Sequence, residues 1–133
     1  DNEEGMISMS IHYFNLETFH QNIQGSKPVV VKYSANWCNY CRNLSQAYHE
    51  LAQKYHSDFT LGEVNVDLFP SLEQAASIEY LPTFVLYQNG EELGRIVNPP
   101  NIGTVELFMT EHVHNISDAE LEAFETFQAL IFS

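Results

Sequence analysis

The sequence has little positive charge. It holds 5 Lys and Arg against 18 Asp and Glu in 133 residues, which gives a formal net charge of −13. Nucleic-acid binding depends on basic side chains that displace counterions from phosphates, and anionic membrane surfaces attract the same side chains. The composition therefore argues against nucleic acid and against a membrane surface as partners.

Long hydrophobic runs are also missing, and so is a set of cysteines. A membrane-spanning helix needs roughly 18 or more apolar residues in a row, whereas the longest β-branched run is Val29-Val30-Val31. Cys38 and Cys41 are the only cysteines, so the chain has one close thiol pair and no disulfide framework. The 44% of apolar residues, over this length, suit one domain with a single core.

The spacing of apolar residues predicts how strands and helices alternate along the chain. The expected strands are residues 7–14, 29–34, 59–66, 83–87 and 91–97, and the expected helices are 16–24, 37–56, 70–77 and one opened by Thr104. Asn15 is a good N-cap for the first helix, and Asn89-Gly90 is a strong hairpin signal between the last two strands. This order predicts an α/β fold with a mixed central β-sheet flanked by helices.

The two ends of the chain are expected to lie outside this sheet. Residues 1–6 form an acidic N-terminal tail, residues 7–114 the domain, and residues 115–133 a C-terminal helical extension. Ser117 and Glu120 make a capping-box pattern at the start of that extra C-terminal helix. Two interpretations stay open: the helix packs on its own domain, or it docks a partner chain or a neighbouring domain.

The chemistry is expected at Cys38 and Cys41, which follow a buried strand and begin a long helix. A helix N-terminus favours an anion and lowers a thiol pKa from about 8.5 into roughly the 3.5–7.5 range. Cys38 is therefore the expected attacking thiolate, and Cys41, one turn inside the helix, the resolving thiol. The pair predicts thiol–disulfide exchange.

Two other interpretations of the cysteine pair are metal binding and inert packing. A structural zinc site needs two further ligands, and among six His the sole close pair is His112-x-His114. No metal and no prosthetic group is therefore predicted.

Several separated motifs resemble the thioredoxin superfamily over about residues 8–114. They are Trp37-Cys38-x-x-Cys41 after Val31-Lys32-Tyr33-Ser34-Ala35, then Ile78-Glu79-Tyr80-Leu81-Pro82-Thr83-Phe84 and Asn89-Gly90. Arg42-Asn43-Leu44 and Tyr48 look more like a catalytic (a-type) domain of a protein disulfide isomerase. The resemblance implies the thioredoxin fold, with the C-terminal helix as an addition.

The resemblance also implies a substrate groove beside the dithiol. In it Trp37 shields the dithiol, Pro82 has a cis peptide bond facing the cysteines, and Leu81 offers backbone groups to an extended substrate. Tyr40 and Tyr80 complete the expected substrate-binding set. Tyr80 stands where the family usually has Gly, so it is expected either to crowd the groove or to add an aromatic contact.

The sequence departs from the family pattern inside the helix as well. Asn39-Tyr40 replaces the usual dipeptide between the cysteines, so a His beside the nucleophile is missing. Gln46 stands near the place of the family's helix proline, and any kink in this helix therefore needs another cause.

Lys32 is the most informative departure, because its position usually carries a buried acid that pairs with a Lys on the next strand. Glu63 occupies that Lys position, so the pair is expected with its charges exchanged. One hypothesis is that Lys32 and Glu63 relay the proton of Cys41 and favour its ionisation. The alternative is a purely structural ion pair.

The resulting prediction is a protein thiol–disulfide oxidoreductase that cycles between the Cys38–Cys41 dithiol and disulfide. Its partners would be protein substrates with disulfides or thiols and a redox partner that recycles the dithiol. The alternative is a non-catalytic thioredoxin-like module that holds a client protein. A start at Asp1 rather than Met favours an extracytoplasmic setting, the ER lumen or periplasm, with the cytoplasm as the other possibility.

Overall fold

The computed structural model describes residues 10–112 and 129–131. Its strands and helices follow in the order β1 (His12–Tyr13), α2 (Leu16–Ile23), β2 (Val29–Ser34), α3 (Asn39–Asn43), α4 (Ser45–Lys54), β3 (Thr60–Asn65), α5 (Pro70–Ala75), β4 (Thr83–Gln88) and β5 (Glu91–Val97). A further helix covers residues 102–112. The order agrees with the alternation predicted from the sequence.

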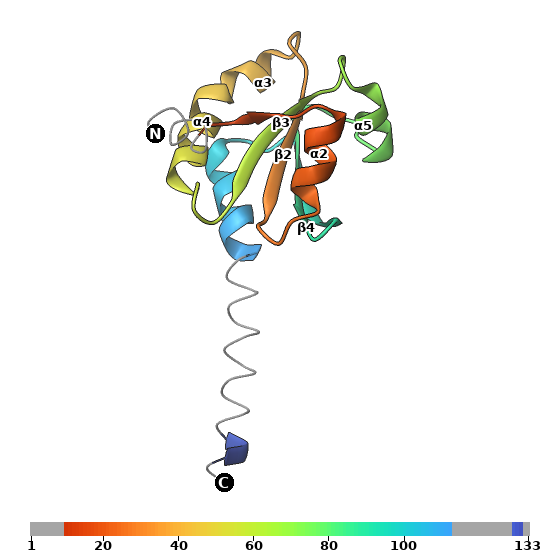
Figure 1. Ribbon diagram of the computed structural model, residues 1–133. Coiled ribbons are helices and arrows are strands. Elements are labelled where there is room, and N and C mark those ends of the chain that lie inside the picture. Colours follow the sequence, from red (N-terminus) through yellow and green to blue (C-terminus); the bar gives the residue numbers. More distant parts are fainter. Residues whose placement is uncertain (1–9, 113–128, 132–133) are drawn as a thin grey trace, which may run out of the picture.

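The strands form one mixed sheet in the order β1-β3-β2-β4-β5. The pairs β1/β3 and β2/β3 are parallel, whereas β4 runs antiparallel to both β2 and β5. The carboxyl ends of β1, β2 and β3 therefore meet at one edge of the sheet. In Figure 1 helices cover both faces, with α2 and α5 on one side and α3 and α4 on the other.

The alternation of side chains along β2 divides the core into two layers. Val30 packs with residues of α4 and of the 102–112 helix, whereas Val29, Val31 and Tyr33 pack with α2 and α5. All six residues of β2 are buried, which agrees with a strand covered on both faces. By the same alternation, Lys32 lies on the α3 and α4 face.

Two short-range signals produce the structure that the sequence predicts. Asn15 caps α2 through a capping box, in which its side chain accepts from Thr18 N and the Thr18 hydroxyl accepts from Asn15 N. Asn89 and Gly90 both have positive φ, 53° and 80°, as a tight two-residue hairpin requires. Both elements depend on neighbouring residues, and both are confirmed.

Two predicted elements differ in the structure. The first strand is expected over residues 7–14, but within the described residues it covers His12–Tyr13, whose register partners on β3 are Gly62 and Glu63. The long helix expected over 37–56 is two helices, α3 and α4, with Leu44 between them. The last helix begins at residue 102, two residues before the predicted Thr104.

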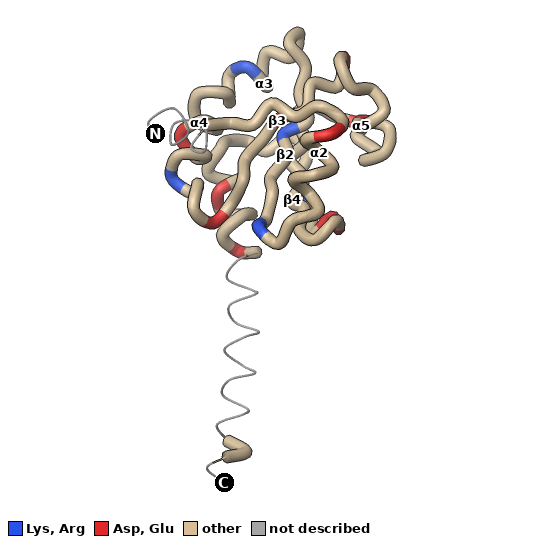
Figure 2. The backbone as a smooth tube through the Cα atoms, viewed as in Figure 1, with Lys and Arg blue, Asp and Glu red and all other residues tan. Residues whose placement is uncertain are grey.

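The predicted N-terminal tail and most of the predicted C-terminal helix lie outside the described residues. Only residues 129–131 of that extension are described, and they are helical. Among the described residues, no helix is both long and apolar enough to cross a membrane. Figure 2 shows the few Lys and Arg residues set apart from one another along the chain, which agrees with the absence of a basic patch from the described domain.

Candidate functional site

Cys38 and Cys41 form a disulfide at the start of α3, with 5.3 Å between their Cα atoms. Cys38 is the N-cap residue, and its Sγ accepts a hydrogen bond from the Cys41 N–H at 3.2 Å. The exposed fraction is 9% for Cys38 and 1% for Cys41. A second molecule therefore reaches Cys38 before Cys41, which agrees with the order of roles expected from the sequence.

Lys32 is fully buried beneath the disulfide, on β2. Its ammonium group donates to the Cys41 carbonyl oxygen at 2.7 Å and lies 3.3 Å from Glu63 Oε1. Lys32 and Glu63 are register partners on β2 and β3, so the expected exchanged pair is present. Burial lowers the pKa of Lys32, and the neighbouring Glu63 carboxylate opposes that shift.

Glu63 connects this buried pair with the outside. Its side chain is 22% exposed. It lines a pocket of about 300 Å³ at the carboxyl edge of the parallel strands, together with Asn36 from the loop that leads to Cys38. Glu63 is therefore the partly exposed member of the ion pair, and Lys32 is the buried one.

The break between α3 and α4 has a cause in this cluster. The Cys41 carbonyl, in the last turn of α3, accepts from Lys32 Nζ at 2.7 Å and from Ser45 Oγ at 3.3 Å. A serine that bonds back to the carbonyl four residues earlier, and a side chain inserted into the helical ladder, both interrupt helices. The chain thus breaks the helix at Leu44 without the family's proline.

Both residues between the cysteines are tied to the rest of the domain. The Arg42 guanidinium donates to the Asn39 side-chain oxygen and to the Asn36 carbonyl. The Tyr40 hydroxyl donates to the Pro99 carbonyl oxygen at 2.6 Å, and its ring packs against the core layer beneath α4. Tyr40, expected to contact substrate, is therefore half-buried in the domain.

The other expected substrate-binding residues lie at the same edge of the sheet as the cysteines. The Leu81–Pro82 peptide bond is cis, as the resemblance implied. Thr83, which follows it, pairs with Tyr33 near the end of β2 and with Val97 at the end of β5. Trp37 and Tyr80 are 68% and 65% exposed, so two large aromatic side chains face outward on loops at this edge.

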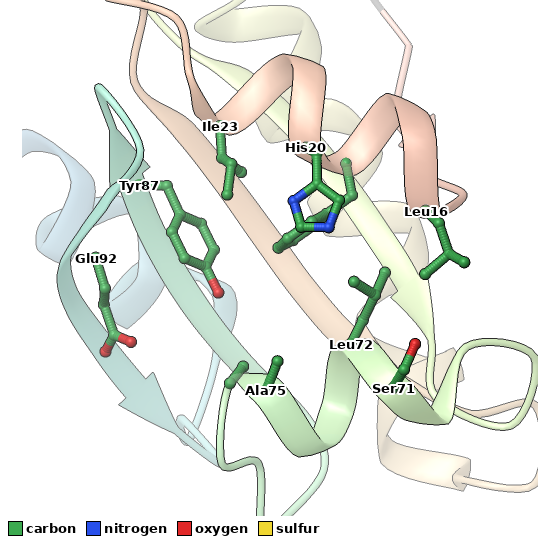
Figure 3. Close-up of a pocket in the computed structure, with 10 residues that line it drawn as sticks. Leu16, His20, Ile23, Ser71, Leu72, Ala75, Tyr87 and Glu92 are labelled. Carbon is green, nitrogen blue, oxygen red and sulfur yellow. The ribbon is translucent and has the colours of Figure 1, made fainter.

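A larger groove, of about 520 Å³, lies on the opposite face and does not include the dithiol. Figure 3 shows Leu16, His20 and Ile23 from α2 facing Leu72 and other residues of α5 across it. None of its lining residues is a predicted site residue. The expected absence of a metal site stays a prediction, although the described residues contain no cluster of three or more His, Cys, Asp or Glu.

A dithiol or disulfide at the start of a helix, beside a cis-proline loop in a mixed sheet, defines a class of redox domains. A model of the family described as Thioredoxin matches residues 10–111. The chain belongs to the thioredoxin family, and its thioredoxin fold is confirmed. A thioredoxin domain with a Cys-x-x-Cys pair supports thiol–disulfide oxidoreductase activity.

Individual relatives agree with this assignment. Thioredoxin H2 of Arabidopsis thaliana is 34% identical over 79 residues, which are 59% of this chain and 59% of the relative. Thioredoxin Asp f 28 of Aspergillus fumigatus is 36% identical over 87 residues, 65% of this chain and 80% of the relative. The structure of the Malassezia sympodialis thioredoxin Mala s 13 has a TM-score of 0.72 at 24% identity, covering 77% of this chain and 90% of that one.

These relatives are named plain thioredoxins, so the expected closeness to a disulfide isomerase domain stays a prediction.

Three residues of the site were missed by sequence reasoning: Arg42, Ser45 and Pro99. Arg42 and Ser45 have a local signal, because they follow Asn39 and Cys41 at helical spacing. Pro99 has none, because it lies 59 residues after Tyr40.

Proposed function

We propose that this protein is a thiol–disulfide oxidoreductase that acts on protein disulfides through Cys38 and Cys41. The observation that carries the proposal is the disulfide between a more accessible Cys38 and an enclosed Cys41. The matched relatives are thioredoxins, and the match covers only 59% of the Arabidopsis relative. The activity, substrates and partners of this chain are therefore proposals.

The reaction has two exchange steps. The Cys38 thiolate attacks one sulfur of the substrate disulfide, a mixed disulfide forms, and the other substrate sulfur leaves as a thiolate. Cys41 then loses its proton and attacks Cys38 Sγ, which forms the internal disulfide and releases the second substrate sulfur. Two electrons and two protons have passed to the substrate, and a reductase partner restores the dithiol.

Lys32 and Glu63 serve the second step. Lys32 donates to the backbone carbonyl of Cys41, and Glu63, its ion-pair partner, lines the pocket of about 300 Å³. In this proposal the Lys32 ammonium first gives a proton to the Glu63 carboxylate, which acts as the base. The resulting Lys32 amine then takes the proton of the Cys41 thiol, and the restored ammonium charge favours the Cys41 thiolate.

Substrate binding uses the edge of the sheet around the cysteines. Trp37 and Tyr80 supply exposed aromatic surface, and the Leu81 backbone before Pro82 pairs with an extended segment of the substrate. Closeness to a disulfide isomerase catalytic domain is a finer proposal, supported by Arg42-Asn43-Leu44 and Tyr48 after the cysteines. Docking through the C-terminal extension concerns residues that are mostly outside the described structure.

Reduction of insulin disulfides, with dithiothreitol as the electron source, tests the activity. We expect Cys38→Ser to abolish turnover and Cys41→Ser to accumulate a mixed disulfide with the substrate. Turnover that does not depend on Cys38 would refute the enzyme proposal. If the inactive variants then bind a reduced client protein as tightly as the wild type does, the result would support the alternative, a thioredoxin-like binding module.

A separate measurement tests the relay. In a Cys38→Ser background only Cys41 reacts with iodoacetamide, so the pH dependence of alkylation reports its pKa. We expect Lys32→Met to raise the Cys41 pKa, whereas Lys54→Met, which changes a lysine exposed on α4, leaves it unchanged. An unchanged Cys41 profile in Lys32→Met would refute the relay and leave the oxidoreductase proposal intact.

A further inference from the structure

Tyr40 joins the dipeptide between the cysteines to a distant loop. Its hydroxyl donates to the Pro99 carbonyl oxygen at 2.6 Å across 59 residues of sequence. The ring is half-buried and packs against the core layer that also contains Leu44 and Tyr48. One end of the redox dipeptide is therefore held both by packing and by a directed hydrogen bond.

The acceptor of this hydrogen bond lies on a stiff segment. Pro99 is buried and stands between Asn98 and Pro100, and a proline followed by a proline has little backbone freedom. Asn98 N donates to the Pro82 carbonyl oxygen at 2.8 Å. A continuous path thus runs from the dithiol through Tyr40 and Pro99 to the cis-proline loop.

We propose that Tyr40 is a positioning residue whose hydrogen bond to Pro99 favours the disulfide form of Cys38 and Cys41. The bond holds the short Cys38-to-Cys41 segment in the shape that the disulfide requires. Without this hydrogen bond, the packing of the Tyr40 ring and the contacts of Arg42 restrain the segment less. This inference rests on the proposed redox role of the cysteine pair, but it concerns the equilibrium of that pair and not turnover.

The sign of the effect follows from the two redox states. In the disulfide form a covalent ring already fixes residues 38–41, and the hydrogen bond is made in that geometry. In the dithiol form the ring is open and residues 38–41 have more conformational freedom, so the hydrogen bond must also restrain this segment and stabilises this form less. A restraint on the open form raises the effective concentration of one thiol at the other and promotes closure.

The equilibrium with glutathione measures this directly. One molecule of oxidised glutathione takes two electrons from the dithiol, which gives the Cys38–Cys41 disulfide and two molecules of reduced glutathione. We expect Tyr40→Phe to lower this equilibrium constant by about threefold to tenfold, since one neutral hydrogen bond is worth about that factor at most. A tenfold change corresponds to a reduction potential about 30 mV less negative.

Tyr55→Phe is a matched control. Tyr55 is also half-buried, and its hydroxyl also makes a 2.6 Å hydrogen bond, to Glu106, but at the end of α4 and away from the dithiol. We expect its glutathione equilibrium to equal that of the wild type within twofold. A shift in Tyr40→Phe no larger than that of the control would overturn the proposal.

Unfolding experiments keep the test decisive if the variant is less stable. Urea unfolding of Tyr40→Phe is measured in the oxidised and in the reduced protein. Thermodynamic linkage requires that the difference between the two stability losses equals the shift in the glutathione equilibrium. A larger loss in the oxidised form supports the proposal, and equal losses in both forms mean that the hydrogen bond is merely structural. Because no substrate is present, the result is independent of whether the protein reduces insulin.

Discussion

Replacing Glu63 by glutamine leaves the buried ammonium group of Lys32 without its counter-ion. The two atoms concerned, Lys32 Nζ and Glu63 Oε1, lie 3.3 Å apart, and the Lys32 side chain is fully buried. Lys32 keeps its hydrogen bond to the Cys41 carbonyl, so the variant isolates the charge of the pair from the backbone contact.

The expected loss of stability is several kcal/mol at neutral pH. With an effective dielectric constant of about 20, two unit charges at this distance attract by roughly 5 kcal/mol. The 22% exposure of Glu63 and the amide oxygen that glutamine retains both reduce this figure. Breaking a buried ion pair by removing one partner costs about 3–5 kcal/mol, and we therefore expect about 2–4 kcal/mol for Glu63→Gln.

The loss should shrink as the pH rises. Burial lowers the pKa of Lys32 and Glu63 opposes that shift, so removal of the carboxylate lowers the pKa further. Between the folded pKa of the variant and the higher folded pKa of the wild type, the unfolded chain binds one more proton than the folded variant but no more than the folded wild type. Stability therefore rises with pH in the variant alone over this range. A neutral amine needs no counter-ion, which is the physical reason.

Urea unfolding from pH 7 to pH 10, followed by circular dichroism, measures both effects. The exposed pair of Lys54 and Glu106 supplies the control, because Glu106→Gln should cost less than about 1 kcal/mol. The double variant Lys32→Met/Glu63→Gln should recover much of the loss, since no charge is then buried. A loss below about 1 kcal/mol in Glu63→Gln, or one that does not change with pH, would refute this reasoning.

Two further predictions concern stability. Gly62→Ala should destabilise the fold by about 1–3 kcal/mol in urea unfolding, because an added Cβ would lie 2.7 Å from the His12 carbonyl oxygen. Gly25→Ala is the control and should be nearly neutral, because the atom closest to its added Cβ is 3.6 Å away; equal losses in the two variants would contradict this prediction. The hydroxyl groups of Tyr33 and Tyr87 share a hydrogen bond. Burial and this hydrogen bond raise the pKa of Tyr33, and burial raises the pKa of Tyr87. Stability should therefore fall as the pH rises above about 10, the pKa of tyrosine in the unfolded chain. Urea unfolding between pH 9 and pH 11 checks this against Tyr33→Phe/Tyr87→Phe, whose stability should fall less steeply with pH. Equal slopes for the wild type and this variant would contradict the prediction.

The elements that were predictable from the sequence are those with short-range causes. Asn15 caps α2 through a residue three positions away, and Asn89-Gly90 turns the chain between β4 and β5. The unbroken apolar run of β2 indicated a strand covered on both faces. The cysteine spacing indicated the chemistry, because two thiols one helical turn apart are close wherever that helix lies.

The cis bond at Pro82 came from the family resemblance and not from local physics, because most bonds before proline are trans. The exchanged Lys32 and Glu63 pair was predicted in the same way, from the positions that the family's charges occupy. In both cases the residues were identified correctly, and the resemblance supplied the spatial relation between them.

Composition and spacing thus determined the class of fold, the acidic character and the redox pair of this protein. Only the tertiary structure decided where the long helix breaks, that Lys32 also binds the Cys41 carbonyl, and which way Tyr40 turns. These three features depend on partners 9 to 59 residues away, Cys41 for Lys32 and Pro99 for Tyr40. Hydrophobic periodicity reports which face of an element is buried, but it carries no information on which carbonyl a buried ammonium or hydroxyl group will meet.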